Sequence, residues 1–302
     1  MRSVTVAVVA IGSDRHVARC LAALAAQERA PPFDVVVVCD AAIADMAQLE
    51  KRFPHVRFVV EAGPPLELAA RAVGAALGDL VLLTEDHCVP RPDWVRTMTE
   101  AKVEGRAVVG GRVETGEGAS ATDWAFYFVD FFRYAAPVAE GHSPSVSVCN
   151  ACYARADLAA IEEIWKSIFH ETAVHEALRL HFGALWLEPR SEVTMSRHVG
   201  LRDALRERYS FGRMFACTRM ASVGFARRLS FALLSPLLPK ILLGRMARKA
   251  LRSPRLFRSF LRSLIPLTLL VLAWSWGEWL GYVTGRRPRS LAVAPELEAA
   301  PR

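Results

Sequence analysis

Four apolar, strand-like runs alternate with helix-like segments within the first 85 residues, and this alternation constrains the fold more than any other feature of the chain. Each run is nearly continuous in apolar residues, which is typical of strands buried on both faces of a sheet. The alternation predicts an α/β fold with a mixed, mainly parallel sheet. The four runs are "VTVAVVAI" from Val4, "FDVVVVCD" from Phe33, "VRFVVE" from Val56 and "DLVLLTE" from Asp79.

Acidic side chains end two of these predicted strands. Asp40 closes the second run, and the triplet Glu85-Asp86-His87 closes the fourth within "GDLVLLTEDHCVPRPDW". In open α/β sheets ligands bind outside the carboxyl ends of the strands. Carboxylate oxygens are the ligands that Mg²⁺ and Mn²⁺ prefer. The triplet therefore indicates a divalent cation site, although a solvated turn after a strand has the same residue pattern.

The charge distribution divides the chain into two regions. Residues 1–198 contain 19 Lys and Arg against 26 Asp and Glu, whereas residues 199–302 contain 19 against 5. Such an asymmetry indicates two regions with different partners. We expect a catalytic domain over residues 1–213 and a basic, apolar helical region with a disordered tail over residues 214–302.

The basic region interleaves charge with apolar sequence. Basic residues recur at three- and four-residue intervals over 245–262, and an apolar stretch of about 22 residues follows from Leu264 to Gly285. An anionic membrane surface explains charge and apolarity together, whereas a nucleic acid explains only the charge. The positive-inside rule favours the cytoplasmic face of the cell membrane. Two arrangements stay open: Leu264–Gly285 spans the bilayer, or it forms an in-plane or re-entrant helix together with Leu229–Gly244.

The six cysteines show no spacing typical of a zinc site. Cys149 and Cys152 form one pair without a second pair to complete a site. All six cysteines are predicted to be reduced, mostly buried thiols in a cytosolic compartment.

Five motifs, in order along about residues 3–213, resemble the family 2 glycosyltransferases, which have the GT-A fold. The opening strand and helix, which end in Gln27, resemble the first strand and helix of the family. "DVVVVCD" resembles the strand whose terminal acid contacts the nucleotide. "ARAVGAALGDLVLLTEDHCVPRPDW" is similar to the family's Arg-Asn-x-Gly helix, its DxD strand tip and its Pro-x-Pro-Asp-Trp sequel. "SVCNACYAR" resembles the acceptor-side segment, and "FHETAVHEALRLHFGALWLEP" the later acidic motif with its helix and strand.

The resemblance implies an enzyme that uses a nucleotide-diphospho-sugar donor, a lipid or glycan acceptor and a divalent metal, Mn²⁺ or Mg²⁺. Glu171 would be the general base for an inverting transfer, and Asn150 would lie on the acceptor side. The implied donor-binding residues are Ala10, Gly12, Asp40, Arg71, Glu85, Asp86 and Arg213, and the implied metal ligands are Asp86, His87 and His198.

The sequence also departs from the family pattern at three positions. His87 replaces the last carboxylate of DxD and Ala72 replaces an Asn, and the family's acidic pair appears as Glu171-Thr172 or, by a one-residue shift, as His170-Glu171. These departures keep open a degenerate relative that binds a nucleotide-sugar without turnover. A nucleotidyltransferase is disfavoured because no glycine-rich, basic phosphate loop follows the first strand. For Glu171 the competing role is a helix N-terminal acid favoured by the helix dipole, and for His170 and His175 we expect ordinary exposed or core imidazoles.

Overall fold

The computed structural model describes residues 2–41, 43, 45–220 and 224–285. Its chain forms two compact units: a sheet unit of Met1–Gly116 and Tyr134–Arg197, and a helical unit of Glu117–Arg133 and His198–Arg302. The boundaries between the compact units therefore differ from the domain boundary predicted at residue 213. Residue 213 stays the predicted end of the catalytic domain. The predicted disordered tail, from Arg286 onward, lies outside the described residues.

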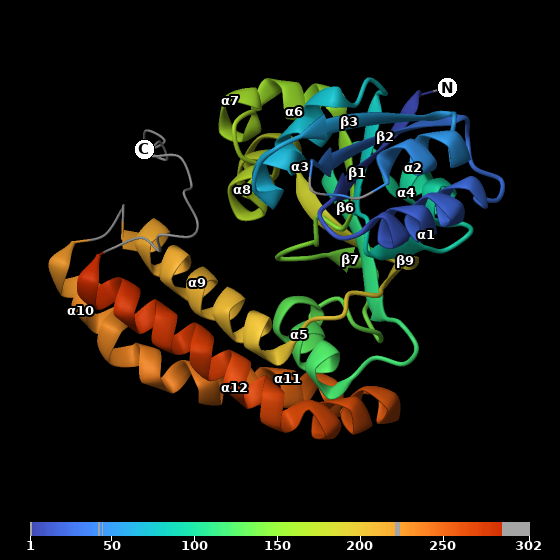
Figure 1. Cartoon of the computed structure of the whole chain (residues 1–302). Helices are drawn as coiled ribbons and strands as arrows, with labels where there is room; N and C mark the ends of the chain where they lie inside the picture. The colour runs from blue at the N-terminus through green and yellow to red at the C-terminus, as the bar shows by residue number, and fades with distance from the viewer. Residues whose placement is uncertain (1, 42, 44, 221–223, 286–302) are drawn as a thin grey trace. The chain divides into compact units, whose positions relative to one another are not determined.

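The sheet unit is built on a nine-stranded mixed sheet (Figure 1). The strand order is β3-β2-β1-β4-β8-β6-β9-β5, and β7 pairs with β9. The strands are β1 (Val4–Ala10), β2 (Phe33–Asp40), β3 (Val56–Glu61), β4 (Leu80–Glu85), β5 (Cys88–Pro90), β6 (Arg106–Thr115), β7 (Gly141–His142), β8 (Asn150–Ala154) and β9 (Ala184–Met195).

The four strands predicted from the apolar runs form one continuous parallel block. β1 pairs in parallel with both β2 and β4, and β2 pairs in parallel with β3. Every residue of β1 is buried, as expected for a central strand covered on both faces. The carboxyl ends of these strands therefore meet at one edge of the sheet, which confirms the predicted fold class.

An antiparallel strand extends this block and was not predicted from the apolar runs. β8 runs antiparallel to β4, with Thr84 opposite Asn150. Its amino end therefore reaches the same edge as the carboxyl ends of β1, β2 and β4. This reversal brings the segment before Asn150 to the edge where ligands bind in α/β sheets.

Helices lie on both sides of the sheet (Figure 1). Apolar residues at helical spacing explain their packing; in α1, for example, Val17, Cys20, Leu21 and Leu24 are buried. The helices of the sheet unit are α1 (Asp14–Ala25), α2 (Met46–Arg52), α3 (Pro65–Ala75), α4 (Trp94–Ala101), α6 (Arg155–Ala160), α7 (Glu162–Trp165) and α8 (Glu171–Phe182). All six cysteines of the chain are free and buried, as predicted.

The helical unit combines an internal helix with the C-terminal region. Its elements are α5 (Ala121–Phe131), α9 (Leu201–Met220), α10 (Phe225–Leu234), the 3₁₀ helix η1 (Ser235–Leu237), α11 (Leu238–Ala250) and α12 (Pro254–Thr284). Aromatic side chains of α5 are core residues, and Phe128 packs edge-to-face against Phe260 of α12. Ala226–Ala250 and Pro254–Thr284 are long and apolar enough to cross a membrane, judged by length and composition.

Candidate active site

The predicted triplet lies at the tip of β4, where Asp86 ties two loops together. Asp86 is 1% exposed, and its Oδ2 accepts a hydrogen bond of 2.7 Å from the Gly12 amide in the loop after β1. The Asp86 amide in turn donates to the Val9 carbonyl. A Cβ at Gly12 would lie 2.8 Å from Asp86 Oδ2, so the close approach requires glycine. The β1 and β4 loops therefore form one rigid edge.

The imidazole of His87 lies between the two neighbouring carboxylates. Its Nε2 is 3.0 Å from Glu85 Oε2, and its Nδ1 is 3.4 Å from Asp86 Oδ1. Burial lowers the pKa of His87, but the negative charge of Glu85 and hydrogen bonds to both acids outweigh it and raise this pKa to about 10. The His87 imidazole is therefore protonated at neutral pH.

The donor atoms of the triplet fit a divalent cation in type. Asp86 Oδ1 is buried and faces His87 Nδ1 at 3.4 Å, so a metal ion would bind this oxygen in place of the imidazole. Two carboxylates with an imidazole suit Mn²⁺ better than Mg²⁺. Among the described residues, however, no group of three His, Cys, Asp or Glu side chains is arranged to hold a metal. A cation would have to replace the contacts that His87 makes with the two acids.

Asn150 connects the β4 edge to three other elements through a fully buried side chain. Its Oδ1 accepts hydrogen bonds from Trp94 Nε1 (2.8 Å) and Ser191 Oγ (3.1 Å). Its Nδ2 donates to the carbonyl of Arg112 (2.7 Å). The amide thus fixes α4, β6 and β9 relative to β8. Its predicted contact with the acceptor stays a prediction, and the contacts observed here are structural.

Removing the indole donor tests this network. Trp94→Phe keeps most of the buried ring but leaves Asn150 Oδ1 with one donor, so we expect the free energy of unfolding to fall by about 1–3 kcal/mol. Thermal unfolding followed by circular dichroism measures the loss. Trp186→Phe is the matched control, because its indole Nε1 makes no hydrogen bond. An equal effect in both variants would contradict a role for the Trp94–Asn150 bond.

Glu171 is the first residue of α8 and reaches back to the segment before β8. Its Oε2 accepts a hydrogen bond of 3.2 Å from the Val148 amide. The next carbonyl, that of Cys149, accepts from Thr84 Oγ1 on β4. Glu171 is half-buried. The structure therefore brings Glu171 to the same sheet edge as the triplet, while its helix position also suits a dipole-stabilising acid.

Of the two histidines near Glu171, His175 is a core residue and His170 is half-buried. His175 is buried, and its Nε2 lies 2.8 Å from the hydroxyl of Tyr153. Burial lowers the pKa of His175 to about 4, and burial also lowers the pKa of His170. Both rings are therefore neutral at physiological pH.

The remaining predicted residues divide between the two units. Ala10 ends β1 and Asp40 ends β2 at the ligand edge, whereas Arg71 is exposed on α3. Arg213 and His198 belong to the helical unit. There the Arg213 guanidinium lies 6.0 Å from the Tyr209 ring centre, and His198 Nδ1 lies 2.9 Å from Asp123 Oδ2. Their donor and metal roles stay predictions.

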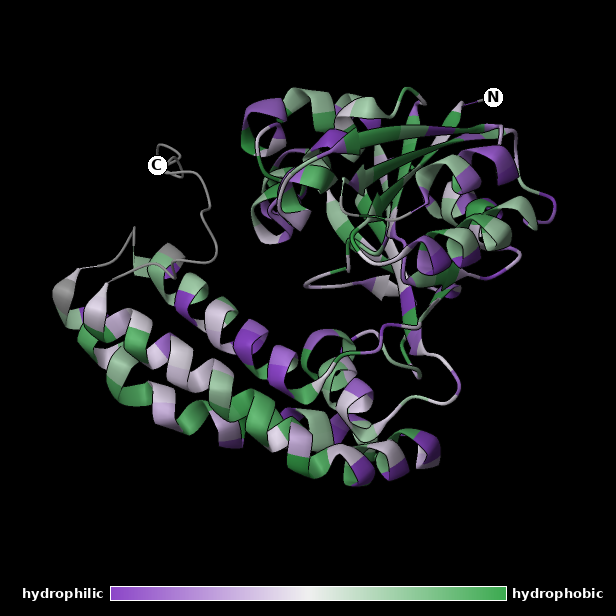
Figure 2. Cartoon of the chain, in the orientation of Figure 1, coloured by the Kyte–Doolittle hydropathy of each residue, from purple (hydrophilic) through white to green (hydrophobic). Residues whose placement is uncertain are grey.

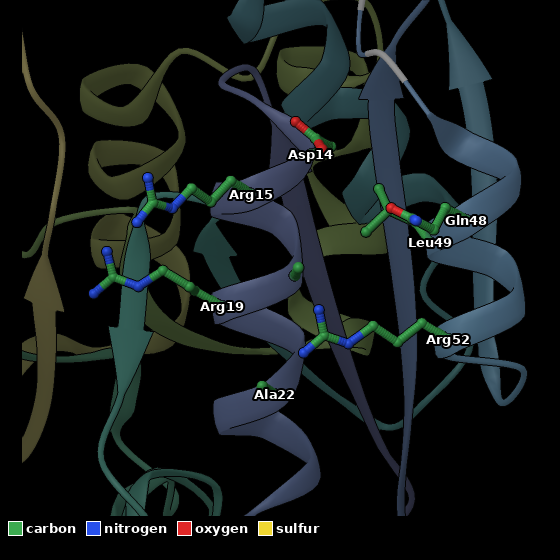
Figure 3. Close-up of a pocket in the computed structure, with 8 residues that line it drawn as sticks. Asp14, Arg15, Arg19, Ala22, Gln48, Leu49 and Arg52 are labelled. Carbon is green, nitrogen blue, oxygen red and sulfur yellow. The ribbon is translucent and has the colours of Figure 1, made fainter.

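A separate pocket of about 420 Å³ lies between α1 and α2 (Figure 3). Its lining includes three basic residues, Arg15, Arg19 and Arg52, and the acidic Asp14. None of the predicted donor-binding residues lines this pocket, so the sheet edge remains the candidate site.

Sequence reasoning missed two positioning residues. Gln27, at the end of the first helical segment, donates from Nε2 to the Arg91 carbonyl and accepts at Oε1 from the Val95 amide. It thereby holds the segment between the triplet and α4. The motif that ends in Gln27 gave a signal for this residue. Ser191, which contacts Asn150, had no signal in the sequence.

The comparisons with known proteins agree with this architecture. The family model described as "Glycosyltransferase like family 2" matches residues 2–159. The chain belongs to this family. It is therefore a glycosyltransferase, and membership supports the use of a nucleotide-sugar donor. No curated protein sequence matches the chain significantly.

Two solved structures show the same GT-A fold as this family 2 glycosyltransferase. The mannosyltransferase PcManGT from Pyrobaculum calidifontis, in complex with GDP-Man and Mn²⁺, is 15% identical with a TM-score of 0.59. That match covers 92% of this chain and 87% of PcManGT. Residues 1–349 of S. aureus TarS are 14% identical with a TM-score of 0.50, covering 95% of this chain and 92% of that one. At such identities the likeness concerns the fold alone.

Proposed function

We propose that this glycosyltransferase is an inverting enzyme that transfers a sugar from a nucleotide-diphospho-sugar to a hydroxyl of a lipid-linked or cell-envelope glycan. The observation that supports this best is the position of Glu171. Its carboxylate is hydrogen-bonded beside the amino end of β8, at the sheet edge that also holds Asp86. Donor and base would thus meet at one edge.

Glu171 would act as the general base of a single displacement. The acceptor hydroxyl transfers its proton to the Glu171 carboxylate while its oxygen bonds to the anomeric carbon of the sugar. The bond between that carbon and the diphosphate oxygen breaks, and the nucleoside diphosphate leaves from the opposite face. Attack opposite the leaving group inverts the anomeric configuration, and a carboxylate within hydrogen-bond reach of the hydroxyl is sufficient.

The donor diphosphate would lie at the rigid edge formed by Gly12 and the triplet. A divalent cation held there by Asp86, and by the His87 imidazole once it has released its proton, would neutralise charge on the leaving diphosphate. PcManGT, whose structure contains Mn²⁺, supports Mn²⁺ as the first ion to test. Asp40 would contact the nucleotide from the end of β2.

The lipid-linked acceptor is proposed because the helical unit is apolar and basic. Its two long apolar stretches and its excess of Lys and Arg suit an anionic membrane surface. By the positive-inside rule such basic segments would lie on the cytoplasmic face, where the enzyme would use a cytosolic nucleotide-sugar.

Nucleotide release tests the proposal directly. The full chain is incubated with UDP-, GDP- and dTDP-sugars, Mn²⁺ or Mg²⁺ and a membrane lipid extract, and the free nucleoside diphosphate is measured. We expect release that depends on both one donor and the extract, and a product of inverted anomeric configuration by NMR. A product that retains the donor's configuration would contradict the single displacement, and donor binding without any release would favour a non-catalytic protein.

A further inference from the structure

The arrangement of α9 and α12 in the helical unit determines how this unit can meet a bilayer. The two helices touch through their backbones. A Cβ at Gly277 of α12 would lie 2.1 Å from the Tyr209 carbonyl, and one at Gly212 of α9 would lie 2.2 Å from the Trp274 carbonyl. Since such distances leave no room for a side chain, α9 and α12 form one closely packed pair.

The two helices run in the same direction over this contact. Tyr209 lies against Gly277, Ala216 lies against Gly281, and the Arg219 guanidinium reaches the Tyr282 hydroxyl at 3.5 Å. With a rise of about 1.5 Å per residue, the same register places Asp203 and Arg206 beside about Leu269 to Leu272 of α12. Charged residues of α9 therefore lie level with the apolar half of α12.

These charges are inconsistent with a spanning α12. Arg202, Asp203 and Arg206 of α9 are exposed. If the apolar half of α12 crossed the bilayer, the α9 packed along it would carry these side chains into the hydrocarbon. Charged side chains at bilayer depth are rare and face a protein interior or a water-filled cavity. The length and composition of α12 permit spanning, but its partner helix opposes it.

Most exposed apolar residues of α12 form one stripe instead of a full circumference, and Leu264 lies at its margin. They recur at intervals of three, four and seven residues, so they share one face of the helix. The opposite face holds the buried Gly277, Glu278 and Gly281. The stripe residues are Leu261, Ile265, Leu269, Leu272, Trp276 and Val283. A single lengthwise stripe is typical of a helix that lies in the membrane interface.

The elements before α12 also expose apolar side chains at regular spacing. Leu229, Leu233, Leu237 and Ile241 are exposed at four-residue spacing along α10, η1 and α11. Figure 2 shows hydrophobic residues concentrated on α10 to α12, whereas hydrophilic residues recur along α9. The helical unit thus combines helices that expose apolar side chains, α10 to α12, with α9, which exposes several charged ones.

Charge indicates which lipids this surface fits. Arg252, Arg258 and Arg262 are exposed around the start of α12, and the latter two precede Leu261 and Ile265 of the stripe by three residues. The sequence contains no acidic residue from Arg208 to Gly277. Arginines beside an apolar stripe complement anionic headgroups above the acyl chains.

We propose that the helical unit lies in the plane of an anionic membrane leaflet, with the α12 stripe from Leu261 to Val283 in the acyl–headgroup boundary and α9 on the water side, so that α12 does not cross the bilayer. This inference rests on the proposed membrane association and settles between the two arrangements that the sequence left open. It is independent of the proposed base and donor residues.

Spin-label depth along the stripe tests the inference on the full chain. Leu261, Leu272 and Val283 are 52%, 47% and 49% exposed and are spaced by 11 residues, or about 16 Å per interval. Each is replaced singly by Cys, labelled with a nitroxide and bound to phosphatidylglycerol–phosphatidylcholine vesicles; the six native thiols are buried. Power saturation with oxygen and a nickel chelate then gives three depths.

An in-plane helix gives three similar, shallow depths, and a label at Arg206→Cys stays accessible to the nickel chelate. A Leu272 label at the bilayer centre, with shallow labels at both ends, would overturn the inference and establish spanning. A full chain that does not bind these vesicles would overturn both the inference and the proposed membrane association. Nucleotide release is measured on the same preparation, so a failure of the proposed reaction is seen separately.

The arginines provide a second arm with a matched control. The triple change Arg252→Gln, Arg258→Gln and Arg262→Gln is expected to weaken partition onto the anionic vesicles about 10²-fold, because each basic residue contributes about fivefold. The change Arg202→Gln with Arg206→Gln, on the proposed water side, should leave partition unchanged. Equal losses in both variants, or equal binding to pure phosphatidylcholine, would contradict the proposed orientation toward anionic lipid.

Discussion

Replacing Glu171 by Gln is expected to lower the rate of sugar transfer by about 10²–10⁴-fold while leaving donor binding intact. Gln keeps the size of the side chain and can still accept the Val148 hydrogen bond through its amide oxygen. It cannot take a proton from the acceptor hydroxyl. Steady-state nucleotide release measures kcat, and calorimetric titration with the donor measures its dissociation constant.

Glu176→Gln on the same helix is the matched control. Glu176 is exposed and pairs with Arg179, so its change should leave kcat unaffected. The competing role of Glu171, that of an acid stabilising the start of α8, predicts a different result. Stability would then fall by about 0.3–1 kcal/mol at unchanged kcat. If the Glu171→Gln variant transferred sugar at the full rate, the general base would therefore have to be another residue.

Replacing Asp86 by Asn is expected to reduce transfer by about 10²–10³-fold, the usual effect of removing one electrostatic stabiliser of a charged transition state. The amide has nearly the same shape, and its oxygen can still accept from the Gly12 amide. The substitution removes the negative charge that, in our proposal, lies beside the metal and the diphosphate. Mn²⁺ binding followed by electron paramagnetic resonance should weaken in parallel.

Asp79→Asn is the control for this change, because Asp79 lies just before the opposite end of β4. Its carboxylate accepts from the amide and hydroxyl of Ser3, far along the strand from the triplet. We expect normal Mn²⁺ binding and transfer in that variant. If Asp86→Asn bound Mn²⁺ and transferred sugar as the unchanged enzyme does, Asp86 would have only a structural role at the Gly12 loop.

Much of the sheet unit follows from short-range patterns. β1 to β4 are continuous apolar runs, and such runs form buried parallel strands whatever the rest of the chain does. The end of β4 at Glu85 was likewise visible, because the apolar residues stop there. Both the parallel block and the position of the triplet at its edge were therefore predicted correctly.

The contacts within the site could not be predicted in the same way. Asn150 bonds to Trp94 and Ser191, which are 56 and 41 residues away, and no local pattern encodes such partners. Its motif suggested the acceptor, whereas its side chain is buried among structural hydrogen bonds. The ring of His87 turns toward two carboxylates because burial leaves it no water to bind.

Local patterns were enough to predict the parallel strands, the acidic edge and the apolar, basic character of the C-terminal region, since each depends on neighbouring residues along the chain. The fold decided that β8 reverses direction and brings Glu171 to that edge. It also decided that the charged α9 packs along the apolar α12 through Gly212 and Gly277. Those outcomes depend on which surfaces bury each other, and packing between distant segments is settled by the whole core.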